Sequence, residues 1–242
     1  MNKLIVTGFL ILCTLNCFST CIAIYIAGNG HIYVAADSRR TFLFGEDNGN
    51  KFESVCKIHN VGSNYFAISG FDDGALLQSA TTALQQNANI DTALKCFGTA
   101  MTVRYKQLMV DAKLVYPEMF KHFLKNGLAD VSFFGFHKGV ANVVNVEFFV
   151  HQDKKGGVVT TYRIHRIFDL TVIGMSRDIT NAKPEDLPSW EIMEQAPELY
   201  VEGLVKIEAK MQPSAVGEPI DLLELKPDGA VWIRKNVNPD TY

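Results

Sequence analysis

The sequence predicts an α+β fold in which two antiparallel sheets pack face to face and helices cover both outer sides. Apolar runs with strand periodicity, separated by Gly and Asn turns, occur before residue 70 and again after residue 130. Between them, apolar residues recur at helical spacing. Strands and helices do not alternate one by one, which disfavours a doubly wound parallel sheet. A four-layer αββα sandwich would bury all of these apolar faces.

The first hairpin is predicted to bring a thiol and an acid together. Ile22, Ile24 and Ile26 alternate with Ala23, Tyr25 and Ala27, and residues 32–36 form a second apolar run, so both segments suit buried strands. The Gly-Asn-Gly-His sequence of residues 28–31 allows a sharp reversal, because Gly and Asn reach positive φ at low cost. The chain therefore turns back on itself, and we expect Asp37 to lie near Cys21.

The rest of the chain divides into further strands and helices at its Gly, Pro and Asn positions. In chain order we expect an exposed loop over residues 40–53, strands over 54–61 and 65–69, helices over 74–86 and 91–125 with an interruption at Pro117, strands over 131–136, 140–150, 158–167 and 170–173, a helix over 188–210, and strands over 220–225 and 230–235. The apolar stripe of the long helix is typical of a core face rather than of a cofactor site.

The N-terminus differs in kind from the rest of the chain. Residues 1–20 start with a short positive segment, continue with an apolar run and end in small residues, as secretory signals do. The apolar run is shorter than the ~20 residues that a membrane-spanning helix needs. We predict a secretory signal or propeptide over residues 1–20 and one domain over residues 21–242. We expect export to the periplasm or the extracellular space, with no membrane attachment once the signal is removed.

The position of the cut stays open at this point. Signal peptidase prefers small residues one and three positions before the cut, which suits cleavage after Ser19, Cys21 or Ala23 better than cleavage after Thr20. Only a cut after Thr20 makes Cys21 the first residue. Self-cleavage of a longer precursor would do the same, and a lipid-modified Cys21 is a further alternative.

Composition limits the partners and cofactors that we expect. The net charge is −3 and no basic cluster stands out, so we expect no nucleic acid partner. The histidines show no metal-ligand spacing, so no metal and no cofactor is expected. Residues 21–242 contain three cysteines, Cys21, Cys56 and Cys96. An odd number indicates at least one free thiol, while a bridge between Cys56 and Cys96 stays open.

Three segments resemble the β subunits of the proteasome and their bacterial relatives, which are N-terminal nucleophile (Ntn) hydrolases. They are AADSR at residues 35–39, SVCKIH at residues 54–59 and AISG at residues 67–70. The VGEPID stretch at residues 216–221 is similar to the VGxPID stretch of a bacterial proteasome-like group known as Anbu. The order of elements matches the family over nearly the whole of the predicted domain.

The resemblance implies roles for individual residues. It sets Cys21 on the family's nucleophile, Asp37 on its acid, Lys57 on its lysine and Gly70 on its oxyanion-hole donor. The family's nucleophile is usually Thr, whereas a Cys occurs in the acylase and amidase branches. Two supporting features differ: the family's late glycine-serine-glycine turn reads GMS at residues 174–176, and its Asp-x-x-Ser has no clear counterpart around residues 211–216.

The chemistry of these residue types fits the implied roles. A terminal α-amine has a pKa of about 7.7–8.0 and can take the proton of the attacking group. The positive charge of Lys57 would favour the Cys21 thiolate, and Asp37 would keep a buried Lys57 charged. The N–H of Gly70 would stabilise the oxyanion. Arg39 is a candidate for binding a substrate carboxylate, although a solvated loop arginine is an equal alternative.

We therefore hypothesise an exported N-terminal Cys hydrolase that cleaves amide or peptide bonds through an acyl-enzyme. It would be a threonine-protease-like peptidase or an amidase, acting on a peptide or an N-acyl compound. The resemblance also implies self-assembly into a homo-oligomer. The alternative is a catalytically inactive proteasome-like binding or assembly module.

Overall fold

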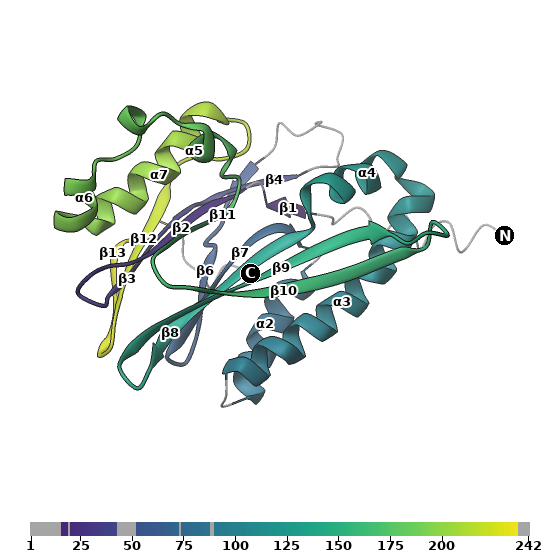
Figure 1. The fold of residues 1–242 in the computed structure, drawn as a ribbon, viewed down its shortest axis with the longest axis horizontal. Coiled ribbons are helices and arrows are strands. Elements are labelled where there is room, and N and C mark those ends of the chain that lie inside the picture. The colour runs from purple at the N-terminus through teal and green to yellow at the C-terminus, as the bar shows by residue number, and fades with distance from the viewer. Residues whose placement is uncertain (1–15, 19, 43–51, 73, 88–89, 237–242) are drawn as a thin grey trace.

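A computed structural model describes residues 16–18, 20–42, 52–72, 74–87 and 90–236, and it has four layers (Figure 1). The larger sheet contains, in spatial order, β10 (Val158–Ile167), β9 (Val140–Gln152), β8 (Ala129–His137), β7 (Asn64–Asp72), β1 (Asn16–Phe18), β4 (Arg39–Phe42) and β5 (Phe52–Ser54), with β6 (Ile58–Val61) paired to β7. The smaller sheet contains β11 (Leu170–Gly174), β2 (Cys21–Ile26), β3 (Ile32–Asp37), β12 (Ile220–Lys226) and β13 (Gly229–Arg234). The pairings between these strands are antiparallel.

Helices cover the outer face of each sheet, as Figure 1 shows. The larger sheet is covered by α2 (Ala75–Gln86), α3 (Ile90–Val115) and α4 (Pro117–Asn126). The smaller sheet is covered by α5 (Arg177–Asn181), the 3₁₀ turn η1 (Pro184–Asp186), α6 (Trp190–Gln195) and α7 (Pro197–Met211). The predicted four-layer αββα fold is therefore confirmed. None of the described helices is long and apolar enough to cross a membrane.

Three apolar clusters hold the layers together, and β2 contributes to two of them. Ile22 and Ile24 face the larger sheet and pack between the two sheets. Cys21, Ala23 and Tyr25 alternate with them and face α7. Both faces of β2 are thus buried, which explains why its sequence is apolar throughout rather than alternating with polar residues.

The break at Pro117 and the helix stop after it follow the prediction. The long helix α3 ends at Val115 and α4 begins at Pro117. Proline suits a first helical position because it has no N–H to satisfy there. Helix α4 ends before Gly127, which has a φ of 80° and whose N–H donates to the carbonyl of Phe123.

Three predictions about secondary structure were wrong. The single helix over residues 188–210 is divided into α6 and α7, because Pro197 starts a new helix, and α5 and η1 precede them.

The exposed loop over residues 40–53 includes strand residues of β4 and β5 at its two ends, while residues 43–51 lie outside the described part. The strand predicted over residues 54–61 begins only at Ile58, since residues 55–57 are not in a strand. Strand pairing across the sheet therefore outweighed the polar composition of the loop.

The packing of α3 on the larger sheet gives a stability prediction. The Phe97 ring is 1% exposed and lies 5.3 Å from the Phe133 ring and 5.5 Å from the Phe148 ring, between centroids. Phe97→Ala should lower the free energy of unfolding by about 3–5 kcal/mol, measured by urea denaturation. The matched control is Val103→Ala on the same helix, where the side chain is 68% exposed, and it should change stability by less than about 0.5 kcal/mol. Equal effects of the two changes would contradict this packing.

Candidate active site

The residues predicted to form the site meet at one end of the sandwich. Cys21 begins β2, Asp37 ends β3, and the register of the hairpin pairs Ile22 with Ala36. Lys57 lies in the short segment between β5 and β6. The antiparallel hairpin thus gives the proximity of Cys21 and Asp37 that the sequence predicted.

The carboxylate of Asp37 is the centre of this site. It is completely buried, and its Oδ1 accepts hydrogen bonds from the backbone N–H of Cys21 at 2.8 Å and from Nζ of Lys57 at 2.9 Å. Its Oδ2 accepts from the backbone N–H groups of Arg39 at 3.2 Å and Gly217 at 3.3 Å. Lys57 Nζ also donates to the carbonyl oxygen of Arg39 at 2.5 Å. One oxygen of Asp37 therefore joins the start of β2 to the buried ammonium.

Burial and charge act in opposite directions on Asp37. Removal from water raises the pKa of its carboxyl, while the Lys57 ammonium and the N–H donors lower it. Lys57 is itself 1% exposed. Since neither charge reaches water, the loss of either partner would leave the other uncompensated.

The thiol of Cys21 is also completely buried, on the face of β2 that packs against α7. Burial raises its pKa well above the usual value, and the negative charges of Asp37 and Glu208 add to this rise. The charge of Lys57 opposes it. With the peptide bond to Thr20 intact, Cys21 therefore carries a protonated thiol and an amide nitrogen rather than an amine.

The segment before Cys21 is part of the fold. Strand β1 pairs with β7 on one side, with Phe18 opposite Gly70, and with β4 on the other side, with Cys17 opposite Thr41. Thr20 is completely buried, and its carbonyl oxygen accepts a hydrogen bond from the N–H of Met175 at 2.7 Å. The bond between Thr20 and Cys21 thus lies inside the structure, between the two sheets.

Gly70 lies on β7 beside this segment, in a conformation that favours glycine. Its φ is 100°, and a Cβ placed on it would lie 2.6 Å from both the Cα of Ala129 and the carbonyl oxygen of Leu128. Both the backbone angle and the contact with β8 therefore exclude a larger residue. Its predicted role as an oxyanion donor stays a prediction.

Arg39 is held by the chain itself. Its guanidinium donates to the carbonyl oxygen of Pro213 and packs against Gly217, where a Cβ would lie 2.6 Å from the guanidinium carbon. The side chain thus attaches β4 to the turn before β12. Binding of a substrate carboxylate by Arg39 stays a prediction.

The VGEPID stretch contacts Asp37 and its neighbour Ser38, which the sequence analysis did not predict. Gly217 donates to the Asp37 carboxylate, and the carbonyl of Pro219 accepts from the N–H of Ser38 at 2.9 Å. The hydroxyl of Ser38 donates to Asp221 at 3.4 Å. The similarity of this stretch to a known motif was the available signal for its place at the site.

Neither Cys56 nor Cys96 takes part in a disulfide with the other. Cys56 is buried, donates to the carbonyl of Ile58 at 3.1 Å, and has a pKa raised by burial to about 11. Cys96 is exposed on α3. The absence of a bridge between them answers the question that the sequence left open. No three His, Cys, Asp or Glu side chains in the described part of the chain are grouped to hold a metal ion.

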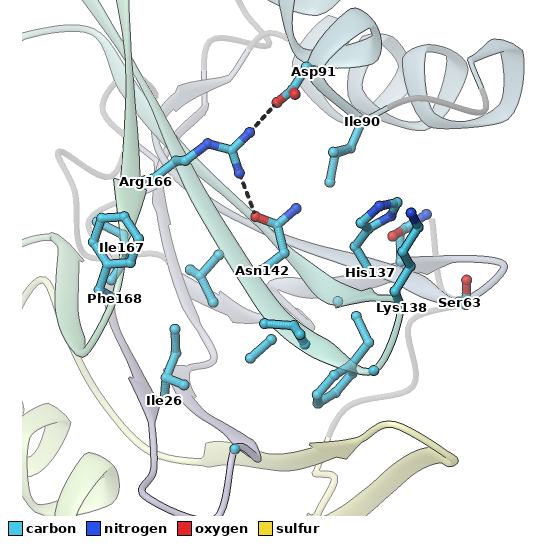
Figure 2. Close-up of a pocket in the computed structure, with 18 of the residues that line it drawn as sticks. Ile26, Ser63, Ile90, Asp91, His137, Lys138, Asn142, Arg166, Ile167 and Phe168 are labelled. Atoms are coloured by element: carbon cyan, nitrogen blue, oxygen red, sulfur yellow. Dashed lines mark hydrogen bonds and ion pairs between the residues drawn. The ribbon is translucent and has the colours of Figure 1, made fainter.

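A cavity of about 1080 Å³ lies away from this site (Figure 2). It is lined by Ile26, the last residue of β2, and by the turn between β8 and β9, where His137 and Lys138 lie. Arg166 borders it and donates to Asp91 at 2.6 Å and to Asn142 at 3.0 Å. None of the predicted site residues lines this cavity. Because Ile26 ends β2 and Cys21 begins it, the cavity lies at the opposite end of β2 from Cys21.

The buried ion pair gives a testable prediction. Lys57→Met should lower the free energy of unfolding by about 3–5 kcal/mol, because it leaves the Asp37 carboxylate buried without its cation. The double change Asp37→Asn with Lys57→Met should recover part of this loss, since both charges are then gone. Lys121→Met is the control, because Lys121 forms an exposed pair with Glu118 and should matter by less than about 1 kcal/mol. A double variant less stable than Lys57→Met would contradict the pairing.

Comparison with known proteins identifies the fold. No protein-family model and no curated protein matches the chain. A mutant of Anbu from Hyphomicrobium sp. strain MC1 matches with a TM-score of 0.50 and 16% identity, over 91% of this chain and 88% of that one. BPH from Thiobacillus denitrificans in complex with epoxomicin matches with a TM-score of 0.42 and 15% identity, over 85% of this chain and 98% of that one. Eukaryotic HslV from Trypanosoma brucei matches with a TM-score of 0.48 and 13% identity, over 85% of this chain and 99% of that one. The chain therefore has the proteasome-like Ntn-hydrolase fold.

Proposed function

We propose that this protein cuts its own chain between Thr20 and Cys21 and then acts as an N-terminal Cys hydrolase of amide bonds. The fold, which is of the peptidase type, supports the hydrolase class. The observation that carries the proposal is the single oxygen of Asp37 that contacts both the nitrogen of Cys21 and the ammonium of Lys57. After the cut, that nitrogen becomes an α-amine in hydrogen-bond contact with a buried acid.

The freed amine supplies the base of the mechanism. An α-amine titrates at about 7.7–8.0 and accepts the thiol proton near neutral pH. The charge of Lys57 lowers the thiol pKa against the effect of burial and so favours the thiolate that attacks. The Cys21 sulfur attacks the substrate carbonyl and Gly70 N–H stabilises the oxyanion. The leaving amine takes a proton, and water releases the acyl group from sulfur.

Strand β1 supports an extended peptide as the substrate. It pairs with β7 and β4 at the same time, so its removal leaves two facing strand edges separated by the width of one strand. An extended peptide completes both pairings through its backbone, whereas a small N-acyl compound completes neither. The chain's own residues 16–18 thus occupy the place that the substrate would take.

An inactive binding or assembly module is the second candidate. Met175 stands where the family's turn has a serine, and the Cys21 thiol is buried with a raised pKa. Both features favour a chain that keeps the sandwich without turnover. In that case the bond before Cys21 would stay intact, or the chain would begin after Cys21.

Export and self-association are further parts of the proposal. Export follows from the signal-like sequence of residues 1–20, of which residues 1–15 lie outside the described part. Assembly into a homo-oligomer follows from the resemblance to proteasome subunits. Fractionation of cells that express the chain tests export, and the solution mass of the cut protein tests assembly. A cut chain that stays in the cytoplasm would contradict export, and a monomeric cut chain would contradict assembly.

Labelling of the nucleophile tests the proposal. A chain that begins at Cys21 should react with an electrophilic peptide, forming one adduct on Cys21, and Cys21→Ala should abolish this adduct. Cys96→Ala is the matched control, because it removes an exposed thiol far from the site and should leave the adduct unchanged. Mass spectrometry of the digested adduct locates the label. Continued labelling in Cys21→Ala would exclude Cys21 as the nucleophile.

The pH dependence of self-cleavage follows from the raised pKa of the thiol. Below that pKa, the thiolate fraction of the uncut chain rises about tenfold per pH unit. Asp37 and Glu208 raise the pKa and Lys57 lowers it, and burial dominates. The rate of cleavage, measured from the intact mass over time, should therefore rise steeply from about pH 6.5 to about pH 8.5. A rate that is flat or that falls over this range would contradict attack by Cys21.

A further inference from the structure

Ser69 on β7 has a hydroxyl whose position is not explained by packing. The residue is 1% exposed, and its Oγ has no hydrogen-bond partner in the described part of the chain. An unsatisfied buried hydroxyl destabilises a fold, so it needs a reason to be present. Its neighbours on β7 in the layer between the sheets include the apolar Ala67, and an alanine would fill the same place without a polar atom.

The hydroxyl lies beside the bond that the proposed function requires to be cut. A Cβ placed on Gly174 would lie 2.1 Å from Oγ of Ser69 and also 2.1 Å from the carbonyl oxygen of Thr20. The two oxygens therefore lie against the same side of one glycine, close to each other. Gly174 is paired with Cys21 across β11 and β2, and it has a φ of 82°. Only a residue without a side chain leaves room for both oxygens.

One donor to this carbonyl is already in place. The N–H of Met175 donates to the Thr20 carbonyl oxygen at 2.7 Å. The carboxylate of Asp130, directly across from Ser69 on β8, accepts the N–H of Gly174 at 3.4 Å and so helps to fix the end of β11. A second donor beside the first is the arrangement that stabilises a developing oxyanion.

We propose that the Ser69 hydroxyl donates to the oxyanion that forms on Thr20 when the chain cuts itself, together with Met175 N–H. Since this role presupposes cleavage between Thr20 and Cys21, it rests on the proposed function. The resemblance predicts a serine in the turn at residues 174–176, where Met175 stands instead. Ser69 supplies the missing hydroxyl from the opposite sheet, and the backbone of Met175 supplies the other donor.

Cleavage between Thr20 and Cys21 conserves atoms and charge through the following bond changes. The Cys21 thiolate adds to the carbonyl carbon of Thr20, which forms a C–S bond and places the negative charge on the Thr20 oxygen. Collapse of this intermediate breaks the C–N bond, and the Cys21 nitrogen takes the proton that the thiol lost. Water then adds to the thioester, releasing the Thr20 carboxylate and restoring the thiol beside a free amine.

Ser69→Ala separates a role in cleavage from a role in structure. Loss of one oxyanion donor should slow the cut by about a hundredfold, measured as the intact mass of the purified full-length chain over time. Because the hydroxyl has no partner in the uncut chain, the same change should leave the urea midpoint unchanged or raise it. Slower cleavage in a chain of equal or greater stability cannot result from damage to the fold.

Ser132→Ala is the matched control. Ser132 is a fully buried serine on the same face of the neighbouring strand β8, and its hydroxyl donates to Oδ1 of Asn145 at 3.3 Å. Its removal should lower the urea midpoint and leave the cleavage rate unchanged. Equal cleavage rates in Ser69→Ala and the unaltered chain would overturn the proposal, and so would equal slowing in Ser132→Ala.

A second form of the protein distinguishes this role from the proposed function. A removable tag that exposes Cys21 directly yields the cut chain without self-cleavage. In this form the otherwise unaltered chain should accept the electrophilic peptide on Cys21 without any self-cleavage step. If the full-length chain never cuts itself but the exposed Cys21 is labelled, the role of Ser69 and the self-cleavage step are both wrong, while the N-terminal Cys hydrolase stands. If the exposed Cys21 is not labelled, the proposed function itself fails.

Discussion

The buried pair of Asp37 and Lys57 is the interaction on which the site depends. Its shared oxygen fixes the nitrogen of Cys21 at the end of the hairpin, and its other oxygen fixes β4 and the turn before β12 through Arg39 and Gly217. A charged pair without contact to water is costly to assemble, and hydrophobic residues of the same volume would often serve stability as well. Its contact with the Cys21 nitrogen supports the chemistry proposed for that position.

The hairpin geometry could be predicted from the sequence, while the contacts around it could not. Alternation in residues 22–26 and the turn at residues 28–31 fix the register, and the register places Cys21 beside Asp37. Lys57 could be assigned only by resemblance, because it lies outside any regular strand. Gly217 could be assigned only through the similarity of residues 216–221 to a known motif, and Ser69 not at all, since each reaches the site through contacts between segments that are far apart in the chain. Local patterns carry no information about such contacts.

In the uncut chain, burial and nearby negative charges keep the Cys21 thiol mostly protonated near neutral pH. Cys21 is buried, its nitrogen is an amide, and the charges of Asp37 and Glu208 oppose the thiolate. Glu208 is itself buried, and its Oε1 accepts from the N–H groups of Asp178 and Ile179 at 2.7 Å and 3.1 Å. On this account, removal of residues 1–20 changes two things at once: it creates a base and frees the strand edges of β4 and β7. Cleavage and activation would then be a single event.

The first residue of the chain that accumulates after expression of the full-length protein tests this account most directly. N-terminal sequencing or intact mass identifies that residue without any probe or substrate. The account predicts a chain that begins at Cys21, with its new amine beside Asp37. A chain that begins at Ile22 or Ile24 would have lost the Cys21 thiol, and a chain that keeps residues 16–20 would have no free amine on Cys21. Either result would contradict the account.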